Sequence, residues 1–322
     1  MESNQVVDAL LGVAIGDAVG VPLEFSSRAQ MIANPAKDMI GYGTYNQAPG
    51  TWSDDSSLTF CLAEALTSGY NLQNISNNFI KWREEAYWSA RGKVFDIGHT
   101  THKAISRLNE ILTTDNLEQL SELKEDGEEF AFENGNGSLM RIMPLLFYIK
   151  GKPIAEQFII IWEVSALTHR HIRAGMSCLI YLRLAEKLME GKQKEVAYQE
   201  MRADILSFWE VIEFPDSERA HFSRVVQNDI RTTTIEALKS GGYVIEVLES
   251  SIWFFLQKES FEDTILSIIN IGHDTDTSAA IAGGLAGIYY GQKSIPEYWL
   301  ISLARLEDIL DLGNSLHQKY CT

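Results

Sequence analysis

The feature that most constrains the fold is a run of small residues near the C-terminal end, 272-GHDTDTSAAIAGGLAGIYYG-291. The residues after Thr277 have the apolar character of a buried helix, yet they include Gly283, Gly284 and Gly287. Each glycine costs a helix about 1 kcal/mol relative to alanine. A helix accepts this cost where another backbone must come close to it. We therefore expect this helix to be central, with its acidic start facing a cleft.

Helical spacing also dominates the rest of the chain. Only residues 39–44 suggest a short strand, and the acidic segment 118–130 is more typical of a mobile loop than of a linker between domains. No repeat of fixed period occurs. The sequence therefore predicts an all-α fold that forms one domain over residues 1–322. Apolar residues recur at three- and four-residue steps in segments 6–18, 58–66, 154–167, 176–189, 203–212 and 244–256.

The charge and cysteine content narrow the possible partners and compartment. Twenty-seven basic and 44 acidic residues give a net charge of −17, which disfavours binding to nucleic acid or to anionic membranes. Cys61, Cys178 and Cys321 are far apart, which argues against a disulfide framework and against a cysteine zinc site. The first residues lack the pattern of a secretory signal, and no uncharged apolar run approaches the ~18 residues of a membrane span. We expect a cytoplasmic monomer.

Two segments place carboxylates at predicted helix starts. In 51-TWSDDSSLTF-60, Ser53 is a good N-cap and Asp54 and Asp55 fill the first turn. Acidic residues there favour the helix dipole by about 0.3–1 kcal/mol, so this segment alone has a sufficient structural explanation. In the C-terminal segment, Asp274 can cap a helix whose first turn contains Asp276.

If both helix starts face one cleft, four carboxylates meet there. Each like-charge pair at ~4 Å repels by about 4 kcal/mol at an effective dielectric of 20, which helix dipoles cannot offset. Protonation of the carboxylates or binding of cations can offset this repulsion. Carboxylates and Ser/Thr hydroxyls suit Mg²⁺, Mn²⁺ or Ca²⁺, and this many carboxylates suit two ions better than one.

Other interpretations of the C-terminal cluster fit less well. Asp274-x-Asp276-x-Ser278 is similar to the start of an EF-hand, but Ala279 and Leu285 stand where that loop needs glycine and glutamate. A haloacid dehalogenase-type phosphatase needs its aspartate after a strand near the N-terminus. Here only 46 residues follow Asp276, and their pattern is helical.

Taken together, six segments resemble the ADP-ribosylglycohydrolase family in order along nearly the whole chain. The resemblance implies a compact orthogonal bundle of helices with a central two-metal cleft, filled by Mg²⁺ and sometimes by Mn²⁺. It carries the metal ligands onto Ser53, Asp54, Asp55, Asp274, Asp276 and Thr277. Ser53 replaces a common threonine, and His273 stands where glycine is common. The segments are 12-GVAIGDAVGVPLE-24, 52-WSDDSSLTFCLAEAL-66, 96-DIGHTTHKAI-105, 135-GNGSLMRIMPL-145, 166-ALTHRH-171 and 272-GHDTDTSAAIAGGLAG-287.

The same resemblance implies a substrate-binding set. The glycines of 135-GNGSLMR-141 would let backbone N–H groups approach a pyrophosphate, although a simple turn before a helix explains them as well. Arg141 would serve either phosphate or an internal ion pair, and His169 would reach the phosphate or ribose region unless it only caps a helix. An adenine-stacking aromatic, with Phe132 and Tyr243 among the candidates, is not identified. The expected substrate-binding residues are Gly98, Gly135, Asn136, Gly137, Ser138, Met140 and His169.

For catalysis, the resemblance points to Asp96, Glu24 and Asp55. Asp96 would bind the ribose beside the scissile bond or orient water, unless it is an N-cap, and Glu24 would gate the metal site and act as acid or base. Asp17 and His171 are expected to be structural. The implied activity is removal of ADP-ribose from a protein side chain, most readily arginine. The alternatives are a binding protein that blocks an ADP-ribosylating toxin, alone or in addition to catalysis, and a metal-dependent phosphatase. Partners would be an ADP-ribosylated protein, an ADP-ribosyltransferase or its target.

Overall fold

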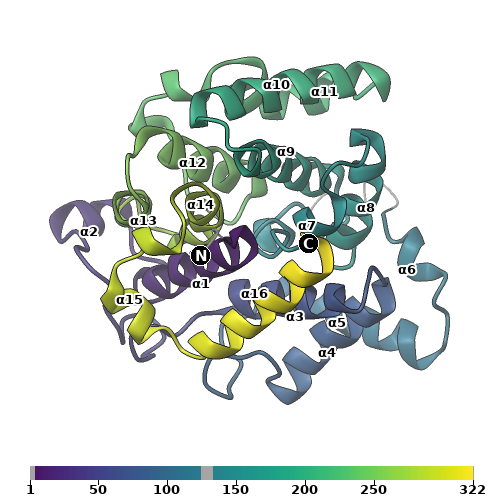
Figure 1. Ribbon diagram of the computed structural model, residues 1–322, viewed down its shortest axis with the longest axis horizontal. Helices are drawn as coiled ribbons and strands as arrows, with labels where there is room; N and C mark the ends of the chain where they lie inside the picture. Colours follow the sequence, from purple (N-terminus) through teal and green to yellow (C-terminus); the bar gives the residue numbers. More distant parts are fainter. Residues whose placement is uncertain (1–3, 125–132, 322) are drawn as a thin grey trace.

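The all-α prediction is confirmed by a computed structural model that describes residues 4–124 and 133–321 (Figure 1). Within these ranges the extended backbone forms only two isolated bridges, Tyr42 with Gln47 and Gly135 with Tyr243. The helices are α1 (Gln5–Gly20), α2 (Arg28–Ala33), α3 (Asp54–Thr67), α4 (Leu72–Glu85), α5 (His99–Thr113), α6 (Gln119–Glu122), α7 (Leu145–Ile149), α8 (Ile154–Ala166), α9 (Ile172–Met189), α10 (Lys194–Val211), α11 (Asp216–Arg219), α12 (Val244–Gln257), α13 (Phe261–Ile269), α14 (Thr275–Tyr290), α15 (Glu297–Ser302) and α16 (Leu306–Tyr320).

The six segments with helical spacing lie in helices to within one residue at their ends, whereas two weaker expectations are only partly met. Residues 39–44 contain one bridge residue, Tyr42, and no strand. Of the acidic segment 118–130, residues 119–122 form the short α6, and residues 125–130 lie outside the described part of the chain. The organisation as one domain stays a prediction.

The predicted close approach of the glycine-rich helix is real, and its partner is α1 (Figure 1). A Cβ added at Gly283 would lie 2.1 Å from the carbonyl oxygen of Gly12, and one added at Gly287 would lie 2.1 Å from that of Asp8. A Cβ at Gly20 would lie 2.4 Å from the Asp276 Cα. The two backbones therefore touch along the length of both helices, and the start of α14 is fixed against the end of α1.

α1 is also long and strongly apolar. Residues Gln5–Leu23, which are α1 and the turn after it, are long and apolar enough to cross a membrane, but 94% of that window is buried inside the protein. This burial is the pattern of a central core helix. α14 shares it, since every residue from Thr275 to Ile288 is buried.

Asp17 on α1 holds the start of α3 in place. Its Oδ1 accepts a 2.9 Å hydrogen bond from the Ser53 backbone N–H. Its Oδ2 accepts bonds from the Ser56 N–H at 3.0 Å and from the Ser56 hydroxyl at 2.6 Å. The structural role expected for Asp17 is confirmed, and α1 thereby positions the starts of both α3 and α14.

A side chain at the α1–α14 contact should be costly. Because Gly283→Ala places a Cβ against the Gly12 carbonyl, the helices must separate, and we expect unfolding free energy to fall by about 1–3 kcal/mol. Urea denaturation followed by circular dichroism measures the change. Gly242→Ala is the control, since nothing lies within 4 Å of its added Cβ, and it should change stability by less than about 0.5 kcal/mol. Equal stabilities of the two variants would contradict the packing argument.

Candidate active site

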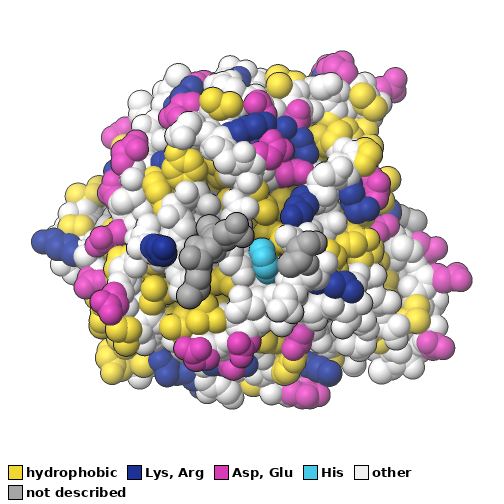
Figure 2. All heavy atoms as spheres, in the orientation of Figure 1, with side chains coloured by type: hydrophobic (Ala, Val, Ile, Leu, Met, Phe, Trp, Pro, Cys, Tyr) yellow, Lys and Arg dark blue, Asp and Glu magenta, His cyan; other side chains and the backbone are white. Residues whose placement is uncertain are grey.

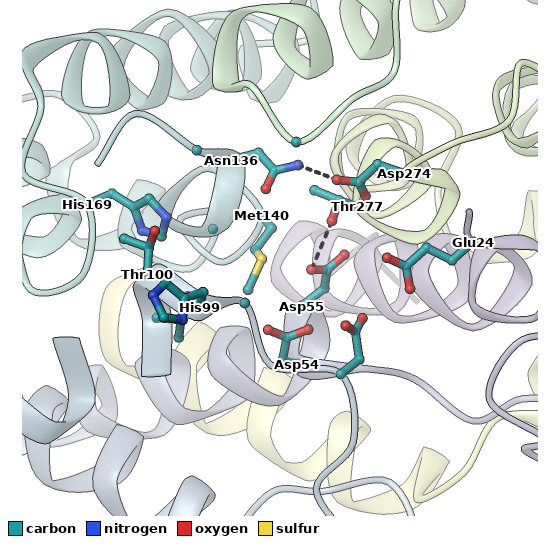
Figure 3. Close-up of a pocket in the computed structure, with 16 residues that line it drawn as sticks. Glu24, Asp54, Asp55, His99, Thr100, Asn136, Met140, His169, Asp274 and Thr277 are labelled. Atoms are coloured by element: carbon teal, nitrogen blue, oxygen red, sulfur yellow. Dashed lines mark hydrogen bonds between the residues drawn. The ribbon is translucent and has the colours of Figure 1, made fainter. Parts of the chain in front are cut away.

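A cavity of ≈ 230 Å³ lies where the N-terminal ends of α3, α5 and α14 meet loop residues 135–137 (Figure 3). In Figure 3 the side chains of Glu24 and Asp274 lie at one end of the cavity and those of His169, His99 and Thr100 at the other. The cavity therefore has an acidic end and a neutral end. It is lined by Glu24, Asp54, Asp55, Asp96, Gly98, His99, Thr100, Thr101, Gly135, Asn136, Gly137, Met140, His169, Gly242, Asp274 and Thr277.

The acidic end brings together the two helix starts predicted to share a cleft. Ser53 caps α3, with its hydroxyl accepting a 3.3 Å bond from the Asp55 N–H. The Thr277 hydroxyl of α14 lies 3.3 Å from Asp55 Oδ1, so α3 and α14 are in direct polar contact. Asp274 occupies the N-cap position of α14, but its side chain makes no capping bond. Its Oδ2 instead accepts a 2.7 Å hydrogen bond from Asn136 Nδ2.

Asp276 is at the centre of the carboxylate cluster. Oxygens of Asp276, Asp55 and Asp17 lie within 4.8 Å of one another, and so do oxygens of Asp276, Glu24 and Asp96. Glu24 and Asp96 are thus closer to the expected metal ligands than the sequence indicated.

The cluster strongly favours protonation or cations. Burial, followed by the charge of Asp96, raises the pKa of Asp54 well above its usual range. Burial and the charge of Asp17 do the same for the pKa of Asp55, and burial and Glu24 for that of Asp276. Each ionised carboxylate here lacks water and faces others of like charge, which is the repulsion expected from the sequence.

The residues present fit divalent cations. Four buried carboxylate oxygens have no hydrogen-bond partner among the described residues: Asp55 Oδ2, Asp274 Oδ1, Asp276 Oδ1 and Glu24 Oε2. Buried carboxylate oxygens without partners are costly, and hard cations such as Mg²⁺ are their natural complement. Asp17 fits the role of ligand less well, because hydrogen bonds from Ser53 and Ser56 occupy both of its oxygens.

Glu24 lies at the edge of the cluster. Its side chain is buried, and burial together with the charge of Asp96 raises its pKa to about 8. A hydrogen bond with the Tyr45 hydroxyl opposes this rise. Glu24 can therefore hold a proton near neutral pH, which is the property of a general acid. Cations bound beside it would lower this pKa, because they favour the ionised form.

Asp96 lies in the loop before α5 and has a left-handed backbone, with φ of 52°. It is not the N-cap of α5, a position that Gly98 occupies. The structural alternative for Asp96 is therefore wrong, and its carboxylate is left to the cavity that it lines.

The neutral end is built from loop 134–138, which pairs with residues 242–244. The Asn136 N–H donates to the Gly242 carbonyl at 3.0 Å, so this amide is not free to bind an anion. Gly137 packs against His169, and a Cβ added there would lie 2.6 Å from His169 Cε1. Glycine at this position lets the histidine reach the cavity.

His169 is neutral at physiological pH. Burial and the nearby charge of Arg141 lower its pKa to about 3, and its Nδ1 lies 2.9 Å from the Thr168 hydroxyl. It does not cap α9. His171 does, accepting a 3.1 Å bond from the Arg173 N–H, as expected of a structural residue.

Two side chains of loop 135–141 do not face the cavity as predicted. The Ser138 hydroxyl is fully buried and accepts a 2.9 Å bond from Ser165, so it is not available to a ligand. Arg141 is fully buried outside the cavity lining and forms no ion pair with a described residue, so the internal ion pair is wrong and contact with phosphate stays a prediction. Its Nη2 donates to the Val164 carbonyl and the Thr168 hydroxyl, and its guanidinium lies 4.6 Å from the ring centre of Phe79. The sequence did not predict where these two side chains point, because a glycine-rich loop has no periodic pattern of side-chain directions.

The remaining residues named as site candidates lie at different places relative to the cavity. Gly98, Gly135 and Met140 line the cavity. Tyr243 is half-buried behind Gly135, while Phe132 lies outside the described residues. The His273 side chain is exposed and does not line the cavity, and its φ of 65° explains why glycine suits this position.

The cavity lining also includes His99, Thr100, Thr101 and Gly242, and Tyr45 lies beside Glu24; none of these was predicted from the sequence. His99 and the two threonines directly follow Gly98 in the matching segment, so proximity to a predicted site residue was an available signal. Tyr45 sits in the loop between α2 and α3, where no pattern distinguishes it.

The buried carboxylates should make the metal-free protein pH-sensitive. The pKa of Glu24 is about 8 in the folded protein against its ordinary value of 4.5, so folding binds a proton and stability falls as pH rises from about 5 to 8. Thermal melts in EDTA across this range measure the slope. Glu24→Gln should reduce it, and saturating Mg²⁺ should raise the melting temperature most at the alkaline end. A melting temperature that rises with pH in EDTA would contradict this account.

Comparison with known proteins agrees with this geometry. The sequence matches the family described as ADP-ribosylglycohydrolase over residues 2–322. It is 30% identical over 314 residues to the ADP-ribosylarginine hydrolase Tri1 of Serratia proteamaculans (strain 568), covering 96% of this chain and 77% of that protein. It is 24% identical over 307 residues to the ADP-ribosyl-(dinitrogen reductase) glycohydrolase of Rhodospirillum rubrum, covering 93% and 90%.

A similar solved structure is described as an ADP-ribosylglycohydrolase-related protein complex. It superposes with a TM-score of 0.78 and 25% identity, over 99% of this chain and 100% of that one. The match of the family over nearly every residue and the shared fold lead to one conclusion: the chain belongs to the ADP-ribosylglycohydrolase family.

Proposed function

We propose that this protein hydrolyses the N-glycosidic bond between ADP-ribose and an arginine side chain of a modified protein, with two Mg²⁺ ions, or Mn²⁺ in their place. The family membership supports ADP-ribosyl glycohydrolase activity. The arginine acceptor is supported by the names of the relatives from Serratia proteamaculans and Pseudomonas putida, both ADP-ribosylarginine hydrolases.

One observation carries the proposal. Four buried carboxylate oxygens, from Glu24, Asp55, Asp274 and Asp276, have no hydrogen-bond partner among the described residues. Glu24, Asp55 and Asp274 line one small cavity, and Asp276 lies beside Glu24 and Asp55. If the site had no function, we would expect these carboxylates to be replaced by other residues, because their mutual repulsion destabilises the fold. The proposed ion-holding residues are Ser53, Asp54, Asp55, Asp274, Asp276 and Thr277. Bound there, the cations would orient the ribose hydroxyls and a water molecule and stabilise charge at the reacting carbon.

An anionic ligand must enter a protein of net charge −17. Figure 2 shows acidic and basic side chains mixed over one face, so the excess charge is not gathered in a single patch there. Inside, Arg141 is a buried cation that pairs with no carboxylate of the described residues, and burial lowers its pKa only to about 10. It therefore stays charged behind His169 at the neutral end. We assign the pyrophosphate to this end and the reacting ribose to the acidic end.

The chain's own residues handle the protons. Water adds its oxygen to the ribose C1″ as the bond to the guanidine nitrogen breaks, so one proton leaves the water and one reaches the departing nitrogen. Glu24 would supply the second proton, since its pKa is raised to about 8 before cations bind, which leaves room for the lowering that the cations cause. Asp96 or Asp55 accepts the first.

Loss of the α14 carboxylates should abolish turnover. With Asp274→Asn/Asp276→Asn, release of ADP-ribose from an arginine-modified protein should fall by about 100-fold or more, because these side chains hold charge at the reacting centre. Chromatography of free ADP-ribose, with Mg²⁺ and with EDTA, measures it. Asp216→Asn is the control, since that side chain is 99% exposed. Full turnover by the double variant, or none by wild type, would overturn the proposal.

The same variant tests the alternative of a non-catalytic toxin blocker. A protein that protects only by erasing the modification should fail to protect cells from an ADP-ribosylating toxin once Asp274 and Asp276 are replaced. Retained protection, together with capture of the toxin by the purified variant, would show that binding suffices.

A further inference from the structure

Three aromatic rings lie beside the acidic end of the cavity, outside its lining. Phe25 directly follows Glu24, and Phe95 directly precedes Asp96. The ring of Tyr45 connects them, with centroids 6.4 Å from Phe25 and 5.2 Å from Phe95. We call Phe25, Tyr45 and Phe95 the aromatic rim.

Phe25 is the most unusual member of the rim. Its side chain is 69% exposed, and its backbone is left-handed with φ of 64°. An exposed phenylalanine loses hydrophobic stabilisation, and a bulky residue at positive φ is strained, so this position costs stability twice. Strained residues of this kind occur more often at functional sites than elsewhere in a protein.

The backbone of Phe25 is firmly held in this position. The Phe25 N–H donates to the His273 carbonyl at 2.7 Å, and the His273 N–H donates to the Ser26 carbonyl at 2.7 Å. The loop that contains Tyr45 is tied to the same segment, because the Thr44 hydroxyl donates to the Glu24 carbonyl at 2.7 Å. The rim is therefore preorganised against the segment that precedes α14.

The rim is paired with carboxylates. The Tyr45 hydroxyl lies beside the carboxylates of Glu24 and Asp96, and Glu24 Oε2 is buried without a hydrogen-bond partner among the described residues. An aromatic face next to unsatisfied carboxylate oxygens is the combination that a guanidinium prefers, since its plane stacks on rings while its N–H groups donate to carboxylates. Adenine would not need the carboxylates, and an anion would be repelled by them.

We propose that Phe25, Tyr45 and Phe95, together with Glu24 and Asp96, form the subsite that holds the guanidinium of the arginine acceptor. This inference rests on the proposed function, because it assigns the acceptor side of that reaction. It places the acceptor at the edge of the carboxylate cluster, at the end of the cavity opposite His169, and makes Phe25 a specificity-determining residue.

Paired substitutions at Phe25 separate π stacking from simple apolar contact. Phe25→Leu keeps an apolar side chain but removes the ring, and KM for an ADP-ribosylarginine peptide should rise by about 3- to 10-fold. Phe25→Tyr keeps the ring and should leave KM within about twofold of wild type. The inhibition constant of free ADP-ribose should not change in either variant. Tyr298→Leu, at a 51% exposed aromatic outside the rim, is the control.

Several results would overturn the assignment. An unchanged KM in Phe25→Leu would show that the ring does not contact the acceptor. An equal rise in the inhibition constant of ADP-ribose would place Phe25 in the nucleotide site instead. A peptide carrying ADP-ribosylserine, where it is hydrolysed, should be insensitive to Phe25→Leu, and an equal loss for both acceptors would also contradict a guanidinium subsite.

The guanidinium subsite and the proposed activity can be tested separately. If wild type releases no ADP-ribose, the proposed function fails, and calorimetry on that same inactive protein can compare ADP-ribosylarginine with ADP-ribose directly. Tighter binding of ADP-ribosylarginine, lost in Phe25→Leu, would support the subsite even then. Equal affinities in wild type would overturn it.

Discussion

The structure depends on the contact between the backbones of α1 and α14. Gly12, Gly283 and Gly287 allow the two helices to touch without intervening side chains, and this contact fixes the start of α14 against the end of α1. Asp17 then ties the start of α3 to α1 through bonds to Ser53 and Ser56. Carboxylates more than 200 residues apart in the sequence are thereby held together against their own repulsion.

The site has a gradient of charge from one end to the other. Its acidic end concentrates unpartnered carboxylate oxygens, whereas its neutral end has an uncharged His169 in front of the buried cation Arg141. This arrangement suits a ligand that is anionic at one end and is cleaved, with cations, at the other. The net charge of −17 therefore does not describe the field that a ligand meets inside the cavity.

Periodicity and glycine placement were enough to predict the helical fold, the central position of α14 and the convergence of the two acidic helix starts. The directions of side chains in loops were not predictable, because a loop has no repeating geometry. Ser138 and Arg141 consequently turn into the core, although their segment was expected to face a ligand. Tyr45 was missed for the same reason, since only the folded chain brings its loop to Glu24.

The pairing of the first helix with one of the last has a consequence for synthesis of the chain. Asp54 and Asp55 leave the ribosome early, but Asp274 and Asp276 follow only after more than 200 further residues. Until α14 emerges, α1 lacks the helix that its glycines contact, and the carboxylate cluster is incomplete. The pairing of these two helices, and with it the assembly of the cluster, therefore comes late in folding.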